Sequence, residues 1–171
     1  NYNNPQLTYL KKLDTSTSLV DLRDNFYKVK KLYNSDPIFY LDSYKFFYNI
    51  DRDFTNNIVF NYMNNFKESP ILLKALSFLA DEIGDYETES MIYRRLIKIQ
   101  PENIQAYRDL AFTYVKLGKY NLASFMYNYI IESKKNIQKI PDFQKIIFEE
   151  ASNLLLNNFT PNIFSSETIK Q

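Results

Sequence analysis

The chain has 171 residues, 45% of them hydrophobic, and its formal net charge at pH 7 is +1. This length suits one domain with a substantial core, and a charge so close to zero does not indicate long-range attraction to nucleic acid or anionic lipid. The absence of cysteine and histidine excludes disulfides, thiol catalysis, imidazole-based triads and nearly all zinc sites.

Six prolines lie where helices are expected to begin or where the chain is expected to fray, because proline fits the first turn of a helix and disrupts its interior. Residues 5–13 predict a short helix and residues 16–33 a longer one, with Ser18 and Asp21 as a capping pair at its start. Asn-Gly turns, Asp-Gly turns and sustained polar–apolar alternation are missing from the sequence. The chain is therefore predicted to be all-α.

The middle of the chain predicts paired helices. Asp36-Pro37 and Ser69-Pro70 each place an N-cap residue before a proline at the first helical position. Beyond Pro70, apolar residues recur at helical spacing on both sides of Gly84. Two helices joined at a glycine make a helical hairpin.

This hairpin recurs along the chain. Its two glycines, Gly84 and Gly118, are 34 residues apart, and the same shift carries Tyr93 onto Tyr127. A fixed period of this length is typical of a solenoid in which each helix pair buries its apolar face against the next. One period earlier, Ile50 stands at the glycine position, so the first copy is expected to turn without glycine.

The copy that begins at Ile104 has aromatic, leucine, small and glycine residues at fixed positions; they are Tyr107, Leu110, Ala111, Tyr114, Gly118, Ala123, Tyr127 and Ile130. In these residues the copy resembles the tetratricopeptide repeat. The copy from Pro70 departs from the family pattern at Glu89, where a small residue is expected and crowding would loosen the helix pair. The resemblance implies a right-handed solenoid of helical hairpins with about eight to nine helices.

The resemblance also divides the chain into segments. Residues 1–35 are expected to form N-terminal helices packed on the array, and residues 36–140 three helix pairs. Residues 141–157 have an apolar face and a polar face, as expected for the helix that shields the last apolar surface of such an array. Residues 158–171 are polar and are expected to be a tail or linker.

A narrower resemblance concerns residues 36–48 and 101–120. These stretches are similar to the C-terminal repeat region of large bacterial proteins that carry a vault/inter-alpha-trypsin-inhibitor domain and a von Willebrand type A domain upstream. The resemblance implies a parent protein that is exported or attached to the cell envelope, in which this segment connects other domains and recognises partners. Without it, the expected location is the cytoplasm.

No motif predicts catalysis, a cofactor or a metal site. Residues 51–57 begin like a calcium loop, but Asn56 stands where that loop has glycine and Tyr62 where it has glutamate. The pairs Asp81-Glu82 and Glu149-Glu150 are interpreted as surface charges, since adjacent residues of a helix point about 100° apart. No apolar run reaches the ~18 residues of a membrane-spanning helix. The sequence predicts a non-enzymatic segment that does not insert into membranes.

In the tetratricopeptide family, the first helix of each pair lines the concave surface. The resemblance thus implies an aromatic row of Tyr44, Phe78 and Phe112 beside a basic pair, Lys74 and Arg108. Such a groove suits a protein or peptide with apolar side chains and a carboxylate. The residues predicted to bind the partner are Tyr40, Tyr44, Phe47, Tyr48, Ile71, Lys74, Phe78, Glu82, Gln105, Arg108, Phe112 and Lys116.

A second interpretation stays open beside the binding scaffold. If residues 5–33 or the tail of the chain fold over the aromatic row, the row is ordinary core and the array is a structural spacer between domains. A third, nucleic-acid binding through interleaved lysines and tyrosines, is disfavoured by the net charge.

Overall fold

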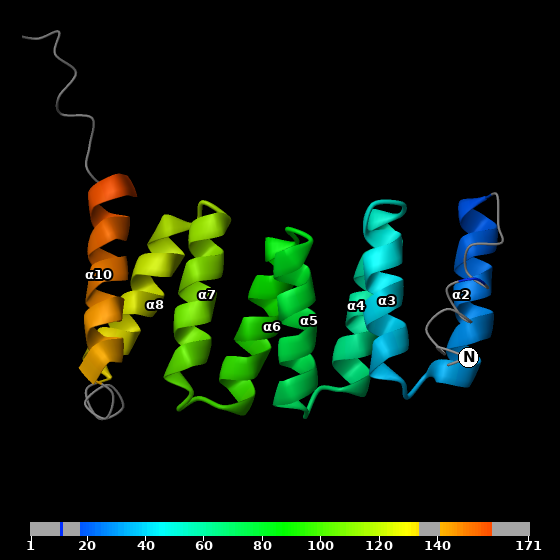
Figure 1. The fold of residues 1–171 in the computed structure, drawn as a ribbon, viewed down its shortest axis with the longest axis horizontal. Helices are drawn as coiled ribbons and strands as arrows, with labels where there is room; N and C mark the ends of the chain where they lie inside the picture. The colour runs from blue at the N-terminus through cyan, green and yellow to red at the C-terminus, as the bar shows by residue number, and fades with distance from the viewer. Residues whose placement is uncertain (1–10, 12–17, 134–140, 159–171) are drawn as a thin grey trace, which may run out of the picture. The chain divides into compact units, whose positions relative to one another are not determined.

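The computed structural model describes Lys11 and residues 18–133 and 141–158, and these residues form eight helices and no strand. The expectation of an all-α fold built from helical hairpins is confirmed. Two predicted segments lie outside the described residues: the helix 5–13, except for Lys11, and the tail beyond residue 158. The helices, labelled in Figure 1, are α2 (Leu19–Tyr33), α3 (Pro37–Tyr48), α4 (Arg52–Asn65), α5 (Pro70–Glu82), α6 (Tyr86–Ile99), α7 (Ile104–Lys116), α8 (Tyr120–Glu132) and α10 (Pro141–Asn158).

The chain divides into two compact units, Asn1–Thr88 and Glu89–Gln171, a division that the repeat pattern does not mark. In the first unit, α3 packs against α4, α5 and α2. Its centre is aromatic: the ring of Phe26 stacks on Phe39 at 5.3 Å and meets Phe54 edge-on at 5.2 Å. All three rings are buried, so aromatic side chains do the packing that aliphatic residues do in most cores.

In the second unit, α7 packs against α8, and α8 against α10. α10 buries Ile147 and Leu154, which lie seven residues apart on one face of the helix. Among the described helices, none combines the length and the apolar character that crossing a bilayer requires. The core positions of the third copy that the sequence predicts are buried; they are Tyr107, Leu110, Ala111, Tyr114, Ala123, Tyr127 and Ile130.

Helix starts follow the local sequence. Ser18 caps α2 by accepting from the Asp21 backbone N–H, and its hydroxyl donates to the Asp21 carboxylate at 2.6 Å. Asp36 and Ser69 cap α3 and α5 in the same way, each directly before a proline. Because these bonds satisfy backbone N–H groups that have no partner within the helix, the predicted caps are confirmed.

The two glycines form the same joint. Gly84 has φ 77° and Gly118 has φ 68°, in the left-handed region that side chains rarely adopt. After each glycine, the next backbone N–H bonds 2.8 Å back to a carbonyl five residues earlier, from Asp85 to Ala80 and from Lys119 to Tyr114. This closure is the Schellman motif of helix ends. The prediction that both glycines occupy equivalent joints is therefore confirmed.

The α3–α4 joint turns without glycine, as the sequence predicts. No non-glycine residue of the described chain has positive φ, and the Asp51 N–H bonds only four residues back, to Phe47 O at 2.8 Å. The Asp51 carboxylate accepts from the Phe54 N–H at 3.1 Å and from Arg23 Nε at 2.6 Å. This joint therefore turns without a residue of positive φ, and the side chain of Asp51 binds both the next helix and Arg23.

Candidate functional site

Three of the residues expected to meet a partner are buried in the first unit. Tyr40, Tyr44 and Phe47 have no exposed surface. Tyr40 is packed edge-on to the rings of Tyr62 and Phe66, and its hydroxyl bonds to asparagine side chains. In this structure they are core residues, because α3 contacts helices on several sides and has little free face.

Tyr44 belongs to a buried polar network. Its hydroxyl donates to Asp85 Oδ2 at 2.8 Å, and Arg52 Nη2 donates to Asp85 Oδ1 at 2.8 Å. Burial and the negative charge of Asp85 raise the pKa of Tyr44 far above its ordinary value, so the hydroxyl keeps its proton. The Arg52 guanidinium also lies 4.2 Å from the centre of the Tyr48 ring. This network fixes the joint between α5 and α6 onto α3 and α4.

One exposed face of the first unit lies on α5. Ile71 is 80% exposed and Phe78 63% exposed, seven residues apart on one side of the helix, with half-buried Lys74 between them. Glu82, at the end of this face, is paired with Lys45 at 2.7 Å, and both side chains are exposed. The predicted second-copy residues therefore share one face, on which two apolar side chains alternate with two charged ones.

On α7, in the second unit, the corresponding phenylalanine is also exposed. Phe112 keeps 53% of its surface accessible, and Lys116 Nζ lies 5.0 Å from the centre of its ring. Lys116 is 3.6 Å from the carboxylate of Glu89, which is buried at a position where the repeat has a small residue. Gln105, the remaining predicted residue of α7, donates to Asp109 one turn further along.

Arg108 has a partner within the chain. Its Nε and Nη2 donate to the two oxygens of Glu150 on α10, at 3.1 and 2.6 Å, and the Tyr127 hydroxyl donates to the same carboxylate at 3.2 Å. The bond to Glu150 raises the pKa of Arg108, and burial followed by the Glu150 charge raises that of Tyr127. The interpretation of Glu150 as an ordinary surface charge is wrong. Its carboxylate pairs with Arg108, which the sequence predicts to bind a partner.

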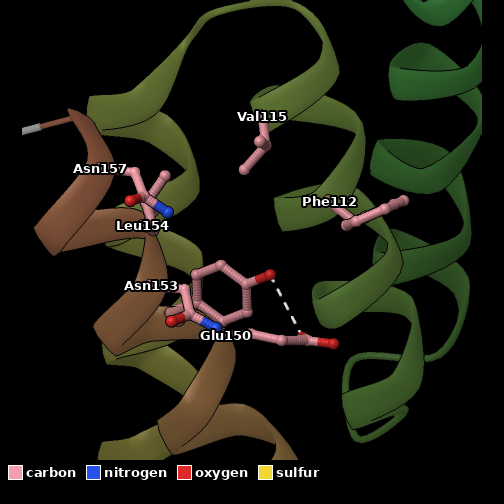
Figure 2. Close-up of a pocket in the computed structure, with 7 residues that line it drawn as sticks. Phe112, Val115, Glu150, Asn153, Leu154 and Asn157 are labelled. Carbon is pink, nitrogen blue, oxygen red and sulfur yellow. Dashed lines mark hydrogen bonds between the residues drawn. The ribbon is translucent and has the colours of Figure 1, made fainter.

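Beside this ion pair is a cleft of about 250 Å³. Figure 2 shows Val115 of α7 across the cleft from Asn153, Leu154 and Asn157 of α10, while the ring of Phe112 lies at the rim and points away from α10. Sequence reasoning missed the contribution of α10, because a closing helix was expected only to shield core. The cleft is lined by Phe112, Val115, Tyr127, Glu150, Asn153, Leu154 and Asn157.

No protein-family model matches the chain, and no curated protein matches its sequence. Among solved structures, a crystal structure of MamA protein is 15% identical, with a TM-score of 0.43 over 88% of this chain and 92% of that one. A second MamA crystal structure is also 15% identical, with a TM-score of 0.44 over 93% of this chain and 91% of its own.

Proposed function

We propose that this chain is a non-catalytic scaffold that binds protein or peptide segments through the exposed faces of α5 and α7. The supporting observation is the exposure of Phe78 and Phe112, at 63% and 53%, at equivalent positions of consecutive copies. Rigid aromatic side chains supply much of the binding energy at protein interfaces. Each unit thus offers an aromatic anchor of its own.

Several residues expected at the interface drop out of this proposal or take a different role. Tyr40, Tyr44 and Phe47 have no surface to offer. Arg108 is already paired with Glu150, so a partner carboxylate gains little from it. The proposed binding residues are therefore the exposed or half-exposed members of the two faces, led by Ile71 and Phe78 on α5 and Phe112 on α7.

A structural spacer is the second candidate. It is favoured by the burial of Tyr44 and by the Arg108–Glu150 pair. Tyr44 and Arg108 were both expected to contact a partner, but each of them is bonded to another residue of the same chain. In that case Phe78 and Phe112 have no ligand, and substituting either one leaves the affinity of the chain for any selected peptide unchanged.

The wider context is proposed on resemblance alone. The likeness of residues 36–48 and 101–120 to the repeat region of large bacterial multidomain proteins supports a role as a recognition module in an exported or envelope-attached protein. Fractionation of the source cells, with an antibody against this chain, tests this location: recovery in the cytoplasmic fraction alone contradicts it.

The binding proposal is tested with a displayed library of random nonapeptides selected on the full chain. Each unit supplies a matched control: Phe60 on α4 is 65% exposed and Phe125 on α8 is 64% exposed, close to the values for Phe78 and Phe112. We expect Phe78→Ala or Phe112→Ala to weaken selected peptides at least tenfold, and Phe60→Ala and Phe125→Ala to change their affinity less than twofold. Equal binding to all four variants would favour the spacer.

A further inference from the structure

The cleft between α7, α8 and α10 has an amide wall and a hydrocarbon wall. Asn153 and Asn157 stand one turn apart on α10, and both are exposed (Figure 2). Among residues 18–133 and 141–158, no hydrogen bond holds either side-chain amide. Each amide has two N–H donors and a carbonyl acceptor. The wall therefore presents two sets of hydrogen-bonding groups to whatever enters the cleft.

The spacing of these amides fits an extended peptide. Four residues advance about 6 Å along a helix, and two residues of an extended chain advance about 6.6 Å while facing the same way. The free N–H and C=O groups of alternate residues in an extended segment thus come at the spacing of Asn153 and Asn157. A helical ligand fits less well, because its backbone groups are bonded to one another.

The size of the cleft suits a small group. Its volume of about 250 Å³ is below the ~300–1,000 Å³ of pockets for free small molecules, so it suits the side chain of a peptide better than a whole ligand of that kind. The groups that such a side chain would contact are Val115, Leu154 and the ring of Tyr127, which are largely hydrocarbon.

The charges around the cleft are already paired. The Glu150 carboxylate accepts from Arg108 and Tyr127, and Lys116 at the Phe112 side lies 3.6 Å from Glu89. A charged ligand side chain would lose its hydration without gaining an available opposite charge, which is costly. The cleft is thus complementary to an uncharged segment.

We propose that this cleft binds an extended, uncharged peptide segment of a partner protein. An apolar side chain of the segment lies between Val115 and Leu154, and its backbone bonds to the amides of Asn153 and Asn157. This inference rests on the proposed function, in that the occupant is a peptide, and it adds the conformation and the charge of that peptide.

The test uses nonapeptides selected on the full chain from the random library, limited to those that Phe112→Ala weakens. Binding is measured to the double variant Asn153→Ala/Asn157→Ala and to the control Asn121→Ala/Asn128→Ala, which removes two exposed asparagines of α8. We expect the first to lower affinity at least tenfold and the second less than twofold. N-methylation of alternate peptide amides, or a Lys or Asp in place of the central apolar residue, should lower it at least tenfold.

Unchanged affinity in the Asn153/Asn157 variant, or a gain of helical circular dichroism when the peptide binds, overturns the extended mode. So does a library that yields only peptides dependent on Phe78. In each of these results the dependence on Phe112 or Phe78 persists, so the proposed function survives. If neither Phe78→Ala nor Phe112→Ala weakens the binding of any selected peptide, the proposed function and this inference are both wrong. Circular dichroism and urea unfolding of each variant establish that it is folded.

Discussion

Arg52 Nη2 lies 2.8 Å from Asp85 Oδ1, and this pair repeats one that Arg23 makes with Asp51 one joint earlier, at 2.6 Å. Both aspartates stand directly before a helix and accept from a backbone N–H of its first turn. The joint aspartate thus caps the next helix and also binds an arginine from an earlier one. At the third joint Lys119 occupies this position, and its side chain makes no capping bond. The first two joints therefore have a side-chain cap that the third lacks.

Asp85→Ala is expected to lower the free energy of unfolding by about 3 kcal/mol, because it removes a buried acceptor of charged hydrogen bonds and a helix cap. Asp85 is 2% exposed and Tyr44 is not exposed at all. Urea unfolding measures the change. The double variant with Tyr44→Phe should lose less than the sum of the single variants, since each removes the same bond. Asp24→Asn, at an exposed position of α2, should change stability by less than about 0.5 kcal/mol.

The Asp51 carboxylate predicts an acid-sensitive step. The bond from Arg23, followed in effect by the Phe54 N–H and the Arg23 charge, lowers the pKa of Asp51 below its ordinary 3.8, against the opposing effect of burial. The folded state therefore holds this proton less tightly than the unfolded state. The resulting stabilisation is complete above pH 3.8 and disappears as the pH falls through the lower folded pKa. Measured by urea unfolding, the free energy of unfolding should fall less between pH 5 and pH 2 in Asp51→Asn than in the unaltered chain. An equal fall in both would contradict this.

Local features of this fold follow from sequence, and long-range pairings do not. The caps at Ser18 and Ser69 and the turns at Gly84 and Gly118 need only neighbouring residues, and all were predictable. The 34-residue period places a residue on its helix but does not say which side chain lies opposite. An exposed phenylalanine in one copy therefore does not imply that the equivalent position of the next copy is exposed.

Tyr44 and Arg108 illustrate that limit. Tyr44 is one period before Phe78, yet it is buried where α3 packs against its neighbours, and its hydroxyl bonds to Asp85, 41 residues away. Arg108 is one period after Lys74, yet it pairs with Glu150, 42 residues away on a helix that does not follow the repeat. Because α10 lies outside the 34-residue register, no shift of the sequence indicates that its asparagines line a cleft.

The two glycine joints predict matched responses to substitution. Gly84→Ala and Gly118→Ala should each cost about 1–2 kcal/mol, because an L-residue is strained at positive φ. A Cβ added at either position would have no atom within 4 Å, so steric crowding adds nothing and the two costs should agree. Asparagine at the same positions should cost less, since its short polar side chain tolerates this conformation. Unequal losses for the two alanine variants, measured by urea unfolding, would indicate that the joints differ.

Glu150→Gln should loosen α10 from the second unit. The glutamine keeps the shape of the side chain but removes the charge that accepts from Arg108, and both side chains are less than one-third exposed, at 25% and 30%. We expect a loss of about 1–2 kcal/mol, measured as faster amide hydrogen exchange in α10. Added salt should narrow the difference in the exchange rate of α10 between the variant and the unaltered chain. The reason is that salt screens the Arg108–Glu150 charge pair, which only the unaltered chain has.

The neighbouring residue is the control for that substitution. Glu149 is 62% exposed and lies 3.8 Å from Lys145 on its own helix, a pair worth a few tenths of a kcal/mol at most. Glu149→Gln removes the same charge one residue away and should leave the exchange of α10 unchanged. If both variants speed exchange equally, the net charge of α10 holds it in place and the Arg108 contact does not. If only Glu150→Gln does so, that ion pair fixes the helix whose asparagines form the amide wall of the cleft.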